Sequence, residues 1–218
     1  MIKGTTQIRR LLNWCKRFCK IGILTLPDMK FRHNALRQLR LLRRHIRFSS
    51  IVCLGQHESQ KLQALKTLYQ VTNRFLERLG VEYWLIHGTL LGHYRLGRPL
   101  PGDVDIDFGA SEQYFDQILG RASDLPNGFN LHDTSFNHYG PKLYVSYKGW
   151  EADIYFYKEE ANQLKPYEKD PKAGYESPLK RDWIFPLQPI EFWEEATYAP
   201  NDAEAVLKTI YGDRKSVV

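Results

Sequence analysis

The sequence is poor in cysteine and has no long apolar run. Only Cys15, Cys19 and Cys53 occur among 218 residues, and no two of them form a Cys-x-x-Cys pair. This count argues against a disulfide framework and against a structural zinc site, and it fits a reducing compartment. Because no stretch of 18 apolar residues occurs and no secretory signal is recognised, we expect a cytoplasmic protein without a spanning helix.

Acidic residues are almost missing from the first 50 positions. This segment holds 13 Lys and Arg residues against the single acid Asp28, whereas residues 51–218 hold 18 against 24 acids. The formal net charge of +6 therefore comes from the N-terminal segment alone. The mildly acidic remainder does not favour a nucleic-acid-binding core, and we expect no nucleic-acid partner.

Two basic amphipathic segments, at residues 8–23 and 31–48, account for this excess of positive charge. Their apolar residues fall at helical spacing, which predicts a basic helical extension over residues 1–56. Such helices bind an anionic membrane surface or an acidic partner, which would place the protein peripherally on the inner face of a membrane. A pair of solvated helices packed on the domain is the open alternative.

Residues 57–218 have the pattern of one α+β domain. Apolar residues keep the 3.6-residue period over 57–79, which predicts a long helix that ends at Gly80. Strands are predicted at residues 81–86, 103–109, 142–148 and 151–157. Further helices are predicted at residues 89–94, 112–119 and 203–211. The polar segment 160–182 predicts a long loop, either a lid over a substrate or a connector.

The most informative segment carries three alternating acids. Asp103, Asp105 and Asp107 alternate with apolar residues, so on a strand their side chains share one face. Carboxylates two residues apart on a strand lie roughly 6–7 Å from each other, and they repel unless a cation intervenes. Mg²⁺, or Mn²⁺ in its place, is a hard cation that such oxygens bind together with phosphate and water. A charged edge strand that resists aggregation is the alternative.

The context of these acids favours the metal site. Gly88 and Thr89 precede them, and a glycine beside a small hydroxyl residue lets backbone amides approach a phosphate closely. Asp153 lies in a later apolar strand, where an unpaired carboxylate would be costly. Lys142 flanks a strand near Asp153 and either meets a diphosphate or stays solvated.

Together these motifs resemble the LicD family, which includes the fukutin-related proteins, within the nucleotidyltransferase superfamily. The resemblance covers about residues 60–213 and rests on segments 87–95, 100–107 and 151–154, with C-terminal matches at 184–187, 199–202 and 207–212. Two positions depart from the family pattern. Gly102 replaces the usual Trp and is expected to loosen packing, and His87 replaces a small residue and is expected to narrow or polarise the pocket.

The resemblance implies a nucleotidyltransferase-like mixed sheet flanked by helices and a metal-dependent phosphotransferase activity. It implies that phosphocholine or a polyol phosphate moves from a CDP-activated donor to a sugar hydroxyl of a cell-surface glycan or glycolipid. A nucleotidyltransferase that uses a nucleoside triphosphate, and an inactive domain that binds a membrane or partner, are the alternatives.

The resemblance also assigns roles to individual residues. Asp105 and Asp107 are expected to bind Mg²⁺, with Asp103 as an auxiliary acid. Asp153 is expected to be a third carboxylate, which either ligates a second metal ion or acts as the base toward the acceptor hydroxyl. The expected contacts to donor phosphates come from Gly88, Thr89, Arg95 and Lys142.

Overall fold

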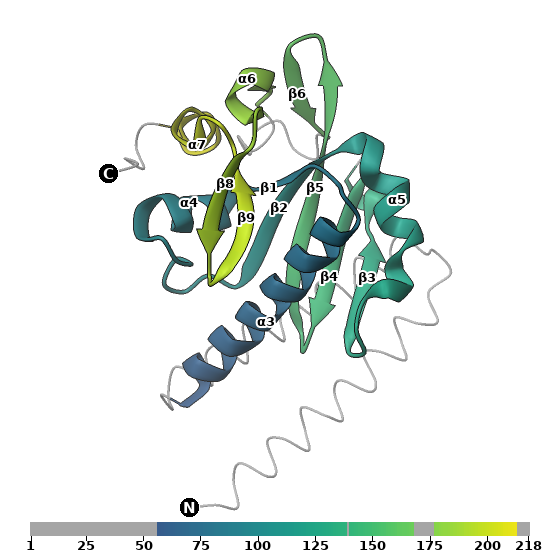
Figure 1. The fold of residues 1–218 in the computed structure, drawn as a ribbon, viewed down its shortest axis with the longest axis vertical. Coiled ribbons are helices and arrows are strands. Elements are labelled where there is room, and N and C mark those ends of the chain that lie inside the picture. The colour runs from purple at the N-terminus through teal and green to yellow at the C-terminus, as the bar shows by residue number, and fades with distance from the viewer. Residues whose placement is uncertain (1–55, 139, 168–176, 213–218) are drawn as a thin grey trace, which may run out of the picture. The chain divides into compact units, whose positions relative to one another are not determined.

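The structure is a computed structural model that describes residues 56–138, 140–167 and 177–212. This part of the chain forms a seven-stranded mixed sheet with helices packed around it, as Figure 1 shows. The predicted α+β class, a mixed sheet flanked by helices, is therefore confirmed. Up to residue 55, the predicted basic extension of residues 1–56 lies outside the described residues. No described helix is both long and apolar enough to span a membrane.

The sheet follows the order β1-β2-β5-β4-β3, and β6 and β7 extend it beside β5. Its strands are β1 Tyr83–Leu85, β2 Asp105–Ser111, β3 Phe129–Asp133, β4 Lys142–Tyr147, β5 Trp150–Glu160, β6 Gln163–Pro166 and β7 Leu179–Lys180. A separate hairpin consists of β8 Gln188–Phe192 and β9 Glu195–Ala199. The helices are α3 Gln56–Arg78, α4 His87–Leu96, α5 Phe115–Gly120, α6 Arg181–Ile184 and α7 Ala203–Tyr211. Short 3₁₀ turns cover Glu112–Tyr114, Ala122–Asp124 and Ser135–Asn137.

The pairing of β2 with β5 is parallel, whereas the other strand pairs are antiparallel. Phe108 of β2 lies opposite Ile154 of β5, which in turn lies opposite Leu143 of β4. Residues paired in this way point to the same face of a sheet, so the three side chains form an apolar row. The alternate positions form a polar row on the other face, which is where the predicted site residues lie.

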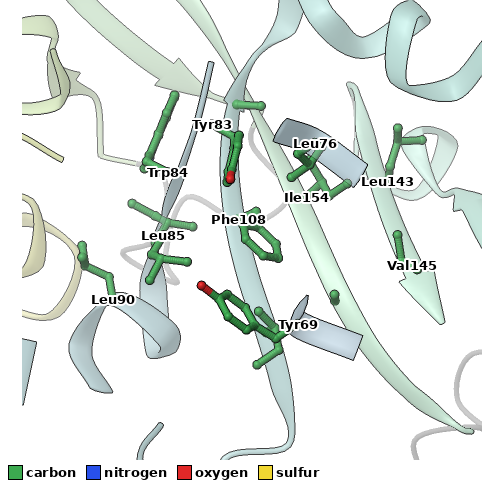
Figure 2. Packing of buried hydrophobic residues seen from close by; sticks show 14 of the residues in the cluster. Tyr69, Leu76, Tyr83, Trp84, Leu85, Leu90, Phe108, Leu143, Val145 and Ile154 are labelled. Atoms are coloured by element: carbon green, nitrogen blue, oxygen red, sulfur yellow. The ribbon is translucent and has the colours of Figure 1, made fainter. Parts of the chain in front are cut away.

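Helix α3 covers the apolar face, and Figure 2 shows the resulting core. The Tyr69 ring stacks on Phe108 with ring centroids 6.0 Å apart and meets Phe192 of β8 edge-on at 5.2 Å. All three side chains are at most 1% exposed. Burying such rings contributes about 1.5–3 kcal/mol each, before the entropy cost of ordering them. The long predicted helix is thus confirmed, and its apolar stripe forms much of the core.

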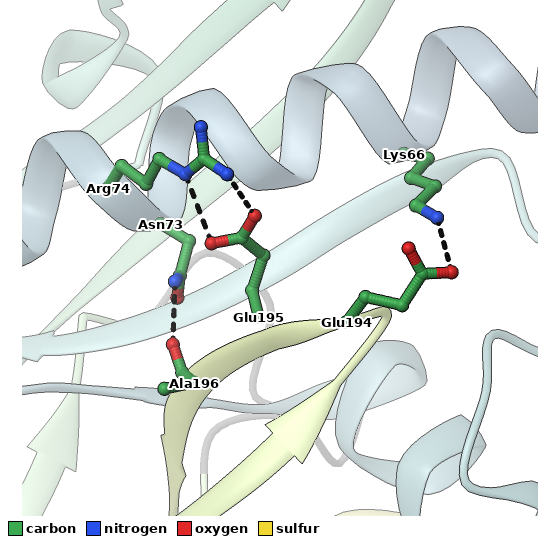
Figure 3. Close-up of polar contacts among 6 residues, drawn as sticks. All are labelled: Lys66, Asn73, Arg74, Glu194, Glu195 and Ala196. Atoms are coloured by element: carbon green, nitrogen blue, oxygen red, sulfur yellow. Dashed lines mark hydrogen bonds and ion pairs between the residues drawn. The ribbon is translucent and has the colours of Figure 1, made fainter.

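The β8–β9 hairpin fastens to α3 through polar contacts at the rim of this core, as Figure 3 shows. Asn73 Nδ2 donates to the Ala196 carbonyl at 2.9 Å, and the Arg74 guanidinium pairs with both carboxylate oxygens of Glu195. Lys66 pairs with the exposed Glu194 at 2.7 Å. Exposed ion pairs of this kind contribute about 0–1 kcal/mol each, so they orient the hairpin more than they stabilise it.

Three local features differ from the sequence-based expectation. Strand β2 begins at Asp105, so Asp103 precedes the strand instead of belonging to it. The segment 160–182 is not one loop, because its described parts form β6 and β7, which extend the sheet. Strand β3 and the β8–β9 hairpin were not predicted, although the short β3 does alternate apolar and polar residues. The last helix, α7, is confirmed, with the Asp202 side chain accepting from the Ala205 amide at 2.9 Å.

Replacing Gly109 with Ala is expected to destabilise the domain. A Cβ at Gly109 of β2 would overlap the indole ring of Trp84. Trp84 belongs to the neighbouring strand β1 and is fully buried. Overpacking of this kind costs about 1–3 kcal/mol, measurable as a lower free energy of unfolding in urea. Gly120→Ala is the matched control, because nothing lies within 4 Å of a Cβ there. Equal stability of the two variants would contradict this packing.

Candidate metal and phosphate site at the start of helix α4

The predicted carboxylates meet on the polar face of the sheet. Asp107 of β2 lies directly opposite Asp153 of β5, and each is 7% exposed. One step along the strands, Asp105 lies opposite Glu151, which is 4% exposed. The parallel pairing therefore brings four acids together. The two acids of each pair are 46 positions apart in the sequence. Glu151 was missed by the sequence reasoning, although its spacing of two residues from Asp153 already placed both on one face.

The first turn of α4 packs against these acids. A Cβ at Gly88 would lie 3.5 Å from Oδ2 of Asp107 and 3.6 Å from Oδ2 of Asp103, so the glycine backbone adjoins both carboxylates. The residue before the helix, Ile86, makes no side-chain hydrogen bond to its first turn. The first amide groups of a helix carry partial positive charge and lack partners within the helix. The carboxylates and the first turn of α4 thus lie close together, and binding of phosphate by the amides of this turn stays a prediction.

Asp107 is held in place through its backbone on both sides. Its amide donates to the Thr89 hydroxyl at 2.9 Å, and its carbonyl accepts from the Ile86 amide at 3.2 Å. Thr89 is 1% exposed, so its hydroxyl replaces water for an otherwise buried N–H group. The Gly-Thr motif therefore has a structural role in addition to the predicted phosphate contact, because its hydroxyl fixes the strand that carries the acids.

Lys142 brings a positive charge to the other end of the row. Its Nζ lies 3.6 Å from Oδ1 of Asp153 and 2.9 Å from the centroid of the Tyr155 ring. The Tyr155 hydroxyl donates to Oδ2 of Asp153 at 3.4 Å, and the ring meets His87 edge-on at 4.6 Å. Lys142 is 3% exposed, so the predicted solvated strand-end position is wrong. Tyr155 is an additional neighbour that the motif did not indicate, whereas His87 was expected to lie at the pocket.

The electrostatics of the row reflect crowded negative charge. Burial and the charges of Asp105 and Asp153 raise the pKa of Asp107 well above its usual range. Burial, followed by the Lys142 charge, lowers the pKa of His87 to about 3, so this imidazole is neutral at physiological pH. An ionised Asp107 therefore costs folding free energy in the bare protein, and a bound cation would offset that cost.

The two departures from the family pattern have backbone explanations. His87 has a φ of 49°, a left-handed conformation that favours glycine and costs other residues about 1–2 kcal/mol. Glycine is thus the unstrained choice at this position, whereas the buried imidazole of His87 lies edge-on to the Tyr155 ring. Gly102 has a φ of 87° in an exposed turn with nothing within 4 Å of a Cβ position. The exposed turn therefore does not support the expectation that Gly102 loosens packing beneath the strand.

The donor set fits a hard divalent cation. Within the described ranges, no three His, Cys, Asp or Glu side chains form a ready cage for a metal ion. Mg²⁺ usually keeps several waters and takes one or two carboxylates together with substrate phosphates. The half-buried Asp105 and the buried Asp107, whose charges repel each other, would supply such ligands beside the first turn of α4. Arg95 is exposed in the last turn of that helix, two turns beyond Gly88, and its phosphate contact stays a prediction.

Replacing Thr89 with Val is expected to destabilise the domain more than replacing it with Ser. Val keeps the shape but removes the oxygen that accepts from the buried Asp107 amide, which costs about 1–3 kcal/mol. Ser loses a methyl group but retains the acceptor. The free energy of unfolding of the three proteins measures the difference. A Ser variant as unstable as the Val variant would show that the hydroxyl does not hold β2.

Comparison with known proteins gives a consistent placement. The human ribitol-5-phosphate transferase FKTN (Homo sapiens) is 27% identical over 157 residues, and the human ribitol 5-phosphate transferase FKRP is 28% identical over 159. Each match covers 69% of this chain but 32% of the relative, so the chain spans about a third of their length. The lincomycin-bound structure of the lincosamide antibiotic adenylyltransferase LnuA covers 70% of this chain and is itself covered to 96%, at 14% identity and a TM-score of 0.43.

A family model described as "LicD/FKTN/FKRP, nucleotidyltransferase domain" matches residues 80–202. This match spans more than half of the 218 residues and includes all the predicted site residues. The chain therefore belongs to the LicD/FKTN/FKRP nucleotidyltransferase-domain family.

Proposed function

We propose that this chain is a metal-dependent phosphotransferase. It moves a polyol phosphate, or phosphocholine, from a CDP-activated donor to a sugar hydroxyl of a glycan or glycolipid. The observation that carries the proposal is the register of Asp107 with Asp153, beside the glycine in the first turn of α4. The relatives FKTN and FKRP are named ribitol-5-phosphate transferases, which favours a polyol phosphate over phosphocholine.

In this proposal Asp105 and Asp107 hold the divalent cation, and Asp103 assists from the turn before β2. The raised pKa of Asp107 shows the crowding of charge that a cation relieves. Bound there, Mg²⁺ or Mn²⁺ supplies positive charge that neutralises phosphate oxygens during transfer. The protein contributes the fixed spacing of the two carboxylates, which the β2–β5 pairing sets.

The start of α4 holds the diphosphate of the donor. Backbone amides near Gly88 and Thr89 donate to phosphate oxygens, since a helix start favours anions. Because Gly88 has no side chain, the backbone of this turn lies close to the carboxylates of Asp103 and Asp107. Arg95 is proposed to neutralise further phosphate charge from the end of the same helix.

Asp153 accepts the proton in the transfer step. The acceptor hydroxyl oxygen forms a bond to the phosphorus nearest the head group, and the bond from that phosphorus to the oxygen it shares with CMP breaks. The hydroxyl proton moves to a carboxylate oxygen of Asp153, and CMP leaves with the electron pair of the broken bond. Asp153 lies one strand away from Asp107, so the proton acceptor and the cation ligand face the same space.

An acceptor on a glycolipid also gives the basic N-terminal segment a role. The 13 Lys and Arg residues of positions 1–50 would hold the protein to an anionic membrane surface, at about 1 kcal/mol for each residue near the surface. This attachment would concentrate the enzyme where a lipid-linked acceptor is found.

Asp105→Asn and Asp107→Asn are each expected to reduce transfer at least about a hundredfold, because either change removes an ionised cation ligand while keeping the shape. Release of CMP from the CDP-linked donor measures the rate. Asp116→Asn is the matched control, since this acid is exposed on α5. Full activity of either site variant, or of the native protein in excess EDTA, would rule out the metal mechanism.

A CDP-linked donor with Mg²⁺ is expected to raise the melting temperature, and either alone is expected to raise it less. The cation relieves the repulsion around Asp107, and ligand binding to the folded state stabilises it. Because the proton and the cation compete for Asp107, whose pKa is raised, the effect of Mg²⁺ should be smaller at pH 5 than at pH 7.5.

A thermal-shift comparison of CDP-ribitol, CDP-glycerol, CDP-choline and nucleoside triphosphates would distinguish the donors. Stabilisation by a nucleoside triphosphate alone would instead favour a nucleotidyltransferase. Absence of any Mg²⁺-linked shift would favour a binding domain without activity.

A further inference from the structure

Lys142 carries a buried positive charge beside the row of Asp105, Asp107 and Asp153. It is the first residue of β4 and lies opposite Tyr155 of β5, while Tyr144 two positions later lies opposite Asp153. The ammonium group sits over the Tyr155 ring and 3.6 Å from Oδ1 of Asp153. Tyr155 and Asp153 lie on the same face of β5, and both contact the Lys142 ammonium group. Tyr155 does so with its ring and Asp153 with its carboxylate.

The positive charge of Lys142 reaches the cation ligands as well. Burial and neighbouring carboxylates raise the pKa of Asp107, and Lys142 acts against them. Burial lowers the pKa of His87, and Lys142 lowers it further. The ammonium group is thus a fixed part of the electrostatics of the whole row, in addition to its contact with Asp153.

Many phosphoryl-transfer sites bind two divalent cations about 3.5–4 Å apart between shared carboxylates. On this sheet the shared carboxylates would be Asp107 and Asp153, which lie side by side. The ammonium group of Lys142 already contacts Asp153, and like charges in a poorly hydrated space repel strongly. A second divalent cation on Asp153 would have to lie against this buried charge.

We propose that the site takes a single divalent cation, on the Asp105 and Asp107 side, and that the Lys142 ammonium replaces the second cation at Asp153. The inference rests on the proposed metal-dependent function. Lys142 is then a positioning residue that holds Asp153 toward the acceptor and keeps its oxygens from binding metal. Its previously expected contact with a donor diphosphate becomes the competing explanation.

The electron paramagnetic resonance signal of free Mn²⁺, followed during a titration, gives the number of bound ions by difference. The native protein is expected to bind one Mn²⁺, and Asp107→Asn is expected to lose it. Lys142→Met is expected to bind two, because Asp153 is released as a ligand, and Lys142→Met combined with Asp153→Asn is expected to return to one. Lys142→Arg keeps the positive charge, so this variant should also bind one Mn²⁺. It is the control that changes the side chain but keeps its charge.

The outcomes separate this inference from the proposed function. Two Mn²⁺ ions on the native protein, or an unchanged single ion on a folded Lys142→Met variant, would overturn the role of Lys142 and leave the metal mechanism intact. No bound Mn²⁺ on the native protein would overturn the metal mechanism itself, and the inference with it. If the Lys142→Met variant bound one Mn²⁺, as the native protein is expected to do, but bound a CDP-linked donor more weakly, Lys142 would be assigned to the diphosphate.

Discussion

The parallel pairing of β2 with β5 is the constraint on which the rest of the site depends. It sets Asp107 beside Asp153 and Asp105 beside Glu151, although the segment between the two strands contains α5, β3 and β4. A shift of one residue in this register would turn one set of acids toward the apolar core, where an unpaired carboxylate is strongly disfavoured. The core contact of Phe108 with Tyr69 under α3 therefore also fixes which face the carboxylates occupy.

The carboxylates of Asp105, Asp107 and Asp153 repel one another, and the groups around them determine where that repulsion can be relieved. On one side the first turn of α4 lies against Asp107 and Asp103, and the Thr89 hydroxyl keeps the strand in place. On the other side Lys142 and the Tyr155 hydroxyl contact Asp153. The two acids of the central pair thus have different environments, which suits a division between holding a cation and accepting a proton.

Much of this arrangement could be predicted from the sequence, for physical reasons that are local. The apolar period of α3, the alternation of acids in β2 and the extent of α7 are each set by neighbouring residues, and each is confirmed, except that β2 begins at Asp105. The face shared by the acids follows from the same alternation. The family resemblance added the order of the motifs, and the match to the family model confirms it.

The features that were missed depend on contacts between distant segments. The burial of Lys142 depends on packing around the β4–β5 hairpin, where its side chain lies against Tyr155 and Asp153. The hairpin of β8 and β9 is oriented by α3, more than 120 positions away, through contacts of Asn73 and Arg74. The left-handed backbone at His87 likewise follows from the tight connection between β1 and α4, and a histidine there has no local signal for it.

The central claim is that Asp105 and Asp107 hold a cation in front of the first turn of α4. Anomalous X-ray diffraction from crystals grown with Mn²⁺ and a CDP-linked donor would locate the ion directly. The account predicts a manganese peak within bonding distance of carboxylate oxygens of both residues, with a donor phosphate between the ion and Gly88. A peak elsewhere on the chain, or a donor bound with no ion at these carboxylates, would contradict it.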